Sequence, residues 1–160
     1  KKVKDYRFEG PWGETVALSQ LFGEHDELIV IHNMGTGCPY CTLWADGFNG
    51  IYQHISDRVA FVVESMDDPK TQRGFHSDRG WKFRMVSSRS TSFRKDMGYG
   101  KSKSSVEPGM SVFKKERDGT IVRVSDTGFG PGDNFCALWD LFDMLPNSNP
   151  SWRARFGYFK

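Results

Sequence analysis

The chain has 160 residues, of which 38% are hydrophobic, and its 22 Lys and Arg against 20 Asp and Glu give a formal net charge of +2. This length suits one domain, and a charge so near neutrality does not imply nucleic acid or an anionic membrane as an obligatory partner. No apolar run approaches the roughly 20 residues that span a bilayer, and the chain does not begin with a signal peptide. Because the chain starts at Lys1 without a methionine, an upstream segment that has been removed remains an alternative. Its 3 cysteines make no disulfide scaffold, so we expect a reducing, cytoplasmic setting.

An opening hairpin and a buried strand are expected at the start of the chain. Residues 6–10 and 15–18 look like short strands around the turn Pro11-Trp12-Gly13. Residues 27–32 form a continuous apolar run that is typical of a buried strand. Residues 33–37 are then the turn that carries the chain into its most informative motif.

That motif is Cys38-Pro39-Tyr40-Cys41, which opens an amphipathic helix. Pro39 suits the first helical turn, where a missing N–H does no harm. The helix is indicated by apolar residues at helical spacing: Trp44, Ala45, Phe48, Tyr52 and Ile55. Gly47 and Gly50 inside this helix cost about 1 kcal/mol each relative to Ala, which indicates close packing or a kink.

Two thiols at the start of a helix indicate thiol–disulfide chemistry. Unpaired N–H groups and the helix dipole favour a thiolate, and can lower the pKa of Cys38 from roughly 8.5 into the range of about 3.5 to 7.5. Cys41, one turn deeper, should stay protonated until it resolves the mixed disulfide that Cys38 forms. We therefore predict Cys38 as the attacking and Cys41 as the resolving residue.

A metal site and an inert thiol pair are the alternatives. Zinc usually needs four protein ligands, and Cys136 stands alone with no second paired motif. His32 ends a strand, and His54 lies more than three helical turns beyond Cys41. The sequence favours redox chemistry, with no metal and no organic cofactor.

A parallel strand–helix–strand unit is expected next. Residues 59–64 form a second continuous apolar run, typical of a strand covered on both faces. Its separation from the first run implies a right-handed parallel crossover. Asp67-Asp68-Pro69 should cap the start of a helix that runs toward Arg79-Gly80. Residues 83–86 should form a further short strand.

The second half of the chain is expected to form a hairpin and a closing helix. Residues 110–115 and 120–124 flank Asp118-Gly119, a strong hairpin signal. The final helix should pack on the sheet through one apolar face, made of Phe135, Leu138, Trp139, Phe142 and Leu145. Cys136 lies off that face and is interpreted as a small packing residue.

This order of elements resembles the thioredoxin fold, an α/β fold with a central mixed sheet flanked by helices, here with an N-terminal hairpin and spanning residues 1–149. The resemblance places Pro108 where thioredoxin-like proteins hold a cis proline beside the redox cysteines, the alternative being an ordinary loop proline. Gly109 follows where a β-branched residue is frequent, which implies looser backbone pairing with a substrate.

A closer resemblance covers most of the chain. Residues 38–50, 80–83, 86–88 and 108–113 are similar to motifs of a bacterial thioredoxin-like family, domain-of-unknown-function family 899. This resemblance implies the fold rather than a reaction. Four residues differ from the apolar or aromatic ones expected in that family: Arg84, Arg89, Arg94 and Lys95.

Two other thioredoxin-like groups share part of the pattern. The Pro-Tyr pair between the cysteines also occurs in glutaredoxins, and the opening hairpin resembles that of peroxiredoxins and of reductases of cytochrome maturation. The peroxiredoxin motif is not reproduced, because Gly35 stands three residues before Cys38 and Thr36 only two before it.

Several side chains are expected to assist the cysteines. Substrate contact is predicted for Pro39, Tyr40, Trp44, Pro108 and Gly109. Proton transfer is predicted for His32 and Asp46. Core packing is the alternative for Trp44, a satisfied strand-end histidine for His32, and a local cap or hydrogen bond for Asp46.

Two further segments set the expected partners. Residues 79–103 are basic, with interleaved aromatic residues, and are interpreted as a solvated loop rather than as a nucleic-acid site, with anion binding as an alternative. If this loop folds beside the cysteine helix, its positive charge would further stabilise the Cys38 thiolate. The aromatic tail, residues 150–160, should dock on this domain or on a second copy, which would make a homodimer. The expected substrate is a protein or small-molecule thiol or disulfide, and the competing function is a non-catalytic module that binds a partner through the loop and the tail.

Overall fold

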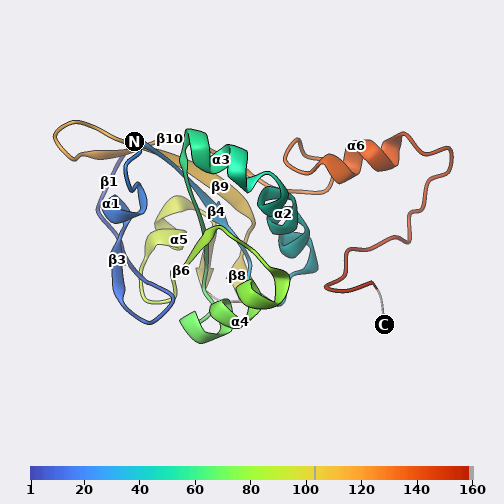
Figure 1. The fold of residues 1–160 in the computed structure, drawn as a ribbon, viewed down its shortest axis with the longest axis horizontal. Coiled ribbons are helices and arrows are strands. Elements are labelled where there is room, and N and C mark those ends of the chain that lie inside the picture. Colours follow the sequence, from blue (N-terminus) through green and yellow to red (C-terminus); the bar gives the residue numbers. More distant parts are fainter. Residues whose placement is uncertain (103, 159–160) are drawn as a thin grey trace.

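The computed structural model describes residues 1–102 and 104–158 (Figure 1). Its strands are β1 (Lys2–Val3), β2 (Arg7–Glu9), β3 (Thr15–Ala17), β4 (Glu27–His32), β5 (Ala60–Ser65), β6 (Arg84–Ser87), β7 (Gly100–Ser102), β8 (Ser105–Val106), β9 (Gly109–Lys115) and β10 (Ile121–Gly128). Its helices are α1 (Leu18–Leu21), α2 (Pro39–Gly50), α3 (Tyr52–Arg58), α4 (Pro69–Arg79), α5 (Phe93–Met97) and α6 (Ala137–Asp143). Lys103 of the basic segment and residues 159 and 160 of the tail lie outside the described residues.

Within these residues a mixed sheet of eight strands has the order β1-β10-β9-β4-β5-β6-β2-β3. β4 pairs in parallel with β5, and β5 in parallel with β6, so the predicted parallel crossover is confirmed. β9 is antiparallel to β4 on the other side. The opening hairpin is confirmed as β2 and β3, and the second hairpin as β9 and β10. These pairings give the predicted thioredoxin-like arrangement.

Side chains alternate between the two faces of the central strands and form two cores. Leu28 and Val30 of β4 belong to the first core, which α1 and α5 cover, whereas Ile29 and Ile31 face the second. The second core is covered by α2, α3 and α4 and contains Trp44, Phe48, Phe61, Val63, Trp81 and Phe83. The sheet is therefore buried on both faces, as its continuous apolar strands indicated.

The helix predicted from the cysteine motif is interrupted. α2 ends at Gly50, and Ile51, with φ −113° and ψ 12°, separates it from α3. A Cβ placed on Gly47 or Gly50 would have no described atom within 4 Å apart from the local backbone. The two glycines therefore mark a kink rather than close packing.

The helix predicted after Asp67-Asp68-Pro69 is confirmed as α4. Asp68 is its N-cap, and the carboxylate accepts a hydrogen bond from the N–H of Thr71 at 2.9 Å. In the described part of the chain, no helix has both the length and the apolar character needed to cross a membrane.

The final helix does not pack on the sheet as predicted. Figure 1 shows α6 beside α2, away from the sheet. Phe135 and Trp139 pack against the second core, whereas Leu141 and Leu145 are 63% and 57% exposed. The physical reason is that α2, α3 and α4 already cover this face of the sheet, so α6 reaches only its margin.

The basic segment is not the solvated loop that its composition indicated. It contains β6, α5 and β7, and Arg94 on α5 is only 1% exposed. The C-terminal tail, which follows α6, contacts this domain. The Phe156 ring lies 6.0 Å from that of Phe75, and the Phe156 carbonyl accepts a hydrogen bond from Arg79.

Candidate active site

The start of α2 holds Cys38 as the prediction required. Cys38 is the N-cap, with extended φ −115° and ψ 104°, and Pro39 is the first helical residue. The backbone N–H of Cys41 donates to Cys38 Sγ at 3.2 Å. A sulfur atom therefore occupies the position at which N-cap side chains normally accept a hydrogen bond.

The surroundings of Cys38 favour its thiolate. A hydrogen bond from the Cys41 thiol lowers the pKa of Cys38 to about 6, with help from the backbone N–H groups of Cys41 and Tyr40, while partial burial opposes this shift. The same contact raises the pKa of Cys41, and burial raises it further. Cys38 is partly exposed and Cys41 is 3% exposed, so one sulfur is charged and accessible while the other is protonated and sheltered.

The turn before the helix fixes the buried thiol. Cys41 Sγ accepts a hydrogen bond from the N–H of Met34 at 3.3 Å. The Asn33 side chain donates to the Cys41 carbonyl at 3.4 Å and accepts from the N–H of Gly35 at 2.7 Å. Residues 33–35 therefore hold Cys41 by both its sulfur and its backbone.

The structure explains why position 35 is a glycine. Its φ is +92°, and a Cβ at this position would lie 2.6 Å from Asp67 Oδ2. The same carboxylate oxygen accepts a hydrogen bond from the N–H of Thr36 at 2.9 Å. Asp67, which follows β5, thus anchors the turn that precedes the thiols.

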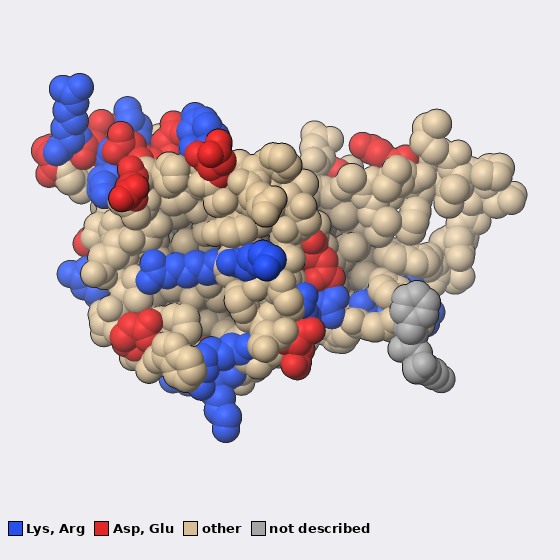
Figure 2. All heavy atoms as spheres, in the orientation of Figure 1, with Lys and Arg blue, Asp and Glu red and all other residues tan. Residues whose placement is uncertain are grey.

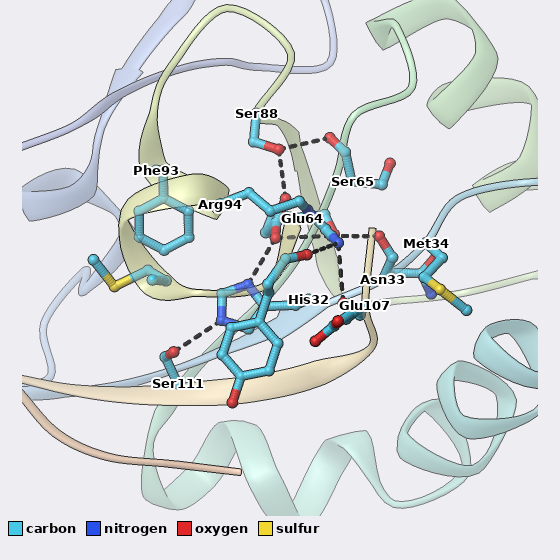
Figure 3. Close-up of polar contacts among 12 residues, drawn as sticks. His32, Asn33, Met34, Glu64, Ser65, Ser88, Phe93, Arg94, Glu107 and Ser111 are labelled. Carbon is cyan, nitrogen blue, oxygen red and sulfur yellow. Dashed lines mark hydrogen bonds and ion pairs between the residues drawn. The ribbon is translucent and has the colours of Figure 1, made fainter. Parts of the chain in front are cut away.

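A buried ionic network lies next to this turn (Figure 3). Glu64 and His32 are fully buried and Arg94 is 1% exposed. Arg94 Nη2 lies 2.9 Å from Glu64 Oε1 and also donates to the Asn33 carbonyl. Because Asn33 also bonds to Cys41, the guanidinium is linked to the thiol turn through one residue. Three separate segments, β4, β5 and α5, meet here.

The carboxylate of Glu64 is ionised in this network. Burial opposes its charge, but the Arg94 guanidinium and hydrogen bonds from His32 and Ser88 outweigh that cost and hold the pKa of Glu64 below its ordinary value. Ser88 Oγ donates to Glu64 Oε2 at 2.6 Å. The guanidinium is further satisfied by the carbonyls of Tyr99 and Glu107.

His32 is neutral. Burial lowers its pKa, against the influence of Glu64. Its Nδ1 lies 2.7 Å from Glu64 Oε1, so this nitrogen carries the proton and donates, leaving Nε2 to accept from Ser111 Oγ at 2.8 Å. The Tyr99 ring stacks on the imidazole at 4.2 Å between centroids. The structure therefore brings His32 to Glu64 and Ser111, in the interior, and not to a cysteine.

Glu64 and Arg94 were missed as site residues. One signal existed for each: Glu64 is the charged residue near the end of an otherwise apolar buried strand, and Arg94 departs from the residues that the family resemblance led us to expect. Nothing in the sequence joins the two, because they are 30 positions apart and meet only through the fold.

Pro108 and Gly109 lie where β9 begins. Among the described residues no peptide bond is cis, so the cis form expected from the resemblance for Pro108 is not found. Gly109 pairs with His32 of β4 and with Gly128 of β10, so its backbone lies between two strands. A Cβ here would lie 2.2 Å from Tyr99 Cε1, which explains the glycine by the ring that covers His32.

The aromatic residues of the motif take different positions. Trp44 is 3% exposed and packs in the second core, as the packing alternative for it stated. Tyr40 is partly exposed, and its ring stacks with that of Trp139 at 6.3 Å. Tyr40 also lines a groove of about 720 Å³ that α6 and the tail form, with Pro131, Phe142, Trp152 and Arg153 among the other lining residues.

Asp46 lies on α2 and is held by other partners. Its carboxylate forms an ion pair with Arg79 and accepts a hydrogen bond from Trp81 Nε1 at 2.8 Å. The structure therefore brings Asp46 to α4 and to the segment after it, as the local hydrogen-bond alternative supposed, and its described contacts do not include a thiol.

Cys136 precedes α6 and is a partly buried free thiol, as is Cys38, whereas the free thiol of Cys41 is buried. Burial raises the pKa of Cys136. Within the described residues, no group of three or more His, Cys, Asp and Glu side chains has an arrangement that could hold a metal ion. The low pKa of Cys38 has local causes, and no residue of the basic segment is among them.

Solved structures with a similar fold include peroxiredoxins. The peroxidoxin BcpB from Mycobacterium tuberculosis matches with a TM-score of 0.65 at 18% identity, over 88% of this chain and 90% of that one. The bacterioferritin comigratory protein of Xanthomonas campestris, described for alkyl peroxide reduction, matches with a TM-score of 0.61 at 17% identity, over 76% and 79%. A peroxiredoxin-like protein from Aquifex aeolicus gives 0.60 at 14%, over 80% and 74%. These likenesses establish the thioredoxin fold.

Sequence comparison places the chain in a family. A comparison with curated protein sequences finds no match. A family model matches residues 2–152, nearly the whole chain, and confirms the resemblance drawn from the motifs. The chain belongs to the family described as "Bacterial protein of unknown function (DUF899)".

Proposed function

We propose that the protein is a thiol–disulfide oxidoreductase in which Cys38 attacks and Cys41 resolves. One observation carries the proposal: Cys38 Sγ accepts the N–H of Cys41 at the start of α2, partly exposed, with the buried Cys41 thiol beside it. A charged, accessible sulfur next to a protonated, sheltered one is the arrangement that a two-step exchange needs.

The reaction balances with two electrons. The Cys38 thiolate attacks one sulfur of a substrate disulfide, forms a mixed disulfide and expels the other sulfur as a thiolate. Cys41 then loses its proton and attacks Cys38 Sγ, which forms the Cys38–Cys41 bridge and releases the second substrate sulfur. The substrate is reduced by two electrons, the dithiol is oxidised, and an external thiol reductant restores it. No metal or organic cofactor enters these steps.

The proton of Cys41 must leave before resolution. Once Cys38 is bound in a mixed disulfide, it no longer carries the negative charge that raises the pKa of Cys41. The Met34 N–H and the nearby Arg94 charge both act to lower that pKa. The expelled substrate thiolate or solvent takes the proton in this scheme. The roles predicted for His32 and Asp46 stay predictions, and the contacts of both side chains support structural roles.

The substrate surface is proposed beside Tyr40. Pro39 and Tyr40 are partly exposed next to Cys38, and Tyr40 opens onto the groove of about 720 Å³. The buried Trp44 ring packs against the Tyr40 ring, with 6.5 Å between the ring centroids. Substrate contact by Pro108 and Gly109 stays a prediction, and the burial of Gly109, whose backbone pairs with β4 and β10, supports a structural role for it. An aromatic-lined groove suits an extended protein segment or a small thiol.

The test is insulin reduction with dithiothreitol as the reductant. We expect the native chain to accelerate it, Cys38→Ser to abolish the acceleration, and Cys136→Ser, the matched control, to leave it unchanged. In Cys41→Ser a mixed disulfide should accumulate on Cys38, detectable by mass. Equal rates for the native chain and Cys38→Ser would favour the competing function, a non-catalytic module that binds a partner.

The pKa of Cys38 predicts a pH dependence. Alkylation by iodoacetamide should rise through a midpoint near pH 6, because the thiolate reacts and the folded chain holds the pKa at about 6. The lowered pKa also means that Cys38 favours the folded, reduced state most at alkaline pH, and that this contribution is lost as the pH falls through 6. A midpoint near about 8.5, as in unfolded chains, would contradict the proposed attack.

Peroxide reduction is a second candidate, supported by the fold that this chain shares with a protein described for alkyl peroxide reduction. The Cys38 thiolate would attack one peroxide oxygen, break the O–O bond and become a sulfenic acid, while the other oxygen takes a proton and leaves as the alcohol. Cys41 would then condense with the sulfenic acid to form the Cys38–Cys41 disulfide and release water. Gly35 at the turn argues against it, since the peroxiredoxin motif is not reproduced. Consumption of cumene hydroperoxide faster than reduction of insulin would favour this candidate.

A further inference from the structure

A second groove, with a volume of about 860 Å³, lies between α4 and β6. The Pro11-Trp12 turn of the opening hairpin and Tyr52 of α3 complete its lining. Cys38 begins α2, whereas Tyr52 follows the end of that helix, and the 12 residues of α2 span about 18 Å. This groove therefore lies toward the opposite end of α2 from the thiols.

Positive side chains line both walls of the groove. Lys70 and Arg73 belong to α4, while Lys82 and Arg84 come from β6 and the segment before it. None of its lining residues is Asp or Glu. Among the described residues these four side chains form no ion pair. Figure 2 shows Lys and Arg side chains across the middle and lower part of this face of the molecule.

Four unpaired cations facing one groove repel one another, and an anion between the walls relieves that repulsion. Arginine and lysine are also the side chains that bind phosphate oxygens most often. Anion binding by the basic segment stays a prediction, and Lys82 and Arg84 are the residues of that segment that line the groove.

The same groove offers aromatic and apolar surface. Of its lining residues Tyr52 is partly exposed, whereas Phe83 and Met85 are buried and belong to the second core. Trp12 is 80% exposed at its edge, and the Arg73 guanidinium lies over the indole ring at 4.2 Å while also donating to the Pro11 carbonyl. An indole held in place yet open to solvent is a stacking surface for a flat ring.

We propose that this groove binds a nucleotide, with the base stacked against Trp12 and the phosphates between the cations of α4 and β6. The volume lies within the range of about 300–1,000 Å³ that small-ligand sites occupy. An aromatic surface beside four unpaired cations matches a ligand that joins a flat base to phosphate charge. Neither cysteine takes part, so the proposal does not depend on the redox function.

The test is calorimetric titration of the reduced protein with ADP, and separately with adenosine and with inorganic pyrophosphate. We expect ADP to bind more tightly than either fragment, because only ADP uses both the ring and the cations. Trp12→Ala should weaken ADP binding by roughly 5- to 150-fold. Arg84→Glu and Lys82→Glu should each weaken it by roughly tenfold or more.

Three controls make the result decisive. Lys95→Glu reverses a charge that is also exposed but lies on α5, outside the groove, and should leave ADP binding unchanged. Cys38→Ser should also leave it unchanged, and thermal unfolding should show that each variant is folded. Absence of ADP binding, or binding that ignores Trp12 and Arg84, would overturn the proposal. Tighter binding of oligothymidylate than of ADP, with the same variants affected, would overturn it in favour of a nucleic-acid strand.

Discussion

The thiol turn and the buried ionic network touch each other, yet they are built in opposite ways. The thiol turn, residues 33–41, is local: Cys38, Cys41 and Met34 interact within seven positions of one another. The network joins His32 of β4, Glu64 of β5 and Arg94 of α5, which the sheet and its connections bring together. Chemistry can be encoded in a short motif, whereas its support comes from distant parts of the chain.

Their energetic roles differ as well. The Cys38 sulfur uses backbone N–H groups that any helix start provides, so it costs the fold little. The network places charged groups where water cannot reach them, a cost that only mutual pairing offsets. We therefore expect damage to the network to unfold the protein before it alters thiol chemistry.

The largest effect is expected from Arg94→Met. It leaves the Glu64 carboxylate buried without its cation, and breaking such a pair costs about 3–5 kcal/mol in free energy of unfolding. Urea unfolding at pH 7 measures it. The loss should shrink at acidic pH, because protonation of Glu64 then removes the unpaired charge.

The matched control is Arg89→Met. Arg89 also pairs with a glutamate, Glu9, but its side chain is 46% exposed, so we expect a loss of only about 0–1 kcal/mol. Equal losses for the two arginines would show that burial does not distinguish the network from a surface ion pair.

A smaller effect is expected from Gly109→Ala, which tests how tightly Tyr99 covers the network. The new Cβ would lie 2.2 Å from Tyr99 Cε1 and 2.5 Å from the Thr127 carbonyl oxygen. Displacing the ring from His32 should cost about 1–3 kcal/mol of stability, measured by thermal unfolding. Gly47→Ala, on α2 with open space around it, should instead stabilise by about 0.5–1 kcal/mol. Unchanged stability of the Gly109→Ala variant would show that the Tyr99 ring can move away without cost.

The same contrast explains what the sequence could predict. The start of α2 at Pro39, the Asp68 cap and the Asp118-Gly119 hairpin depend on neighbours within a few positions, and the structure confirms all three. Arg94 was placed in a solvated loop because its neighbours are polar, and only its contact with Glu64 of β5 in the folded chain explains its burial. The final helix was placed on the sheet because its own sequence shows an apolar stripe. The stripe does not reveal that α2, α3 and α4 already cover that face of the sheet.

The smallest effect is expected from Asp46→Asn, which asks whether the thiol helix carries a catalytic carboxylate. The amide keeps an acceptor for Trp81 Nε1 but loses the charge that pairs with Arg79, a partly exposed pair worth about 1 kcal/mol or less. We expect the rate of insulin reduction to stay unchanged, because the described contacts of Asp46 include neither cysteine. General acid–base catalysis contributes about 10²–10⁴-fold. A rate loss of that size, with stability nearly intact, would assign proton transfer to Asp46 and extend the chemistry beyond the local turn.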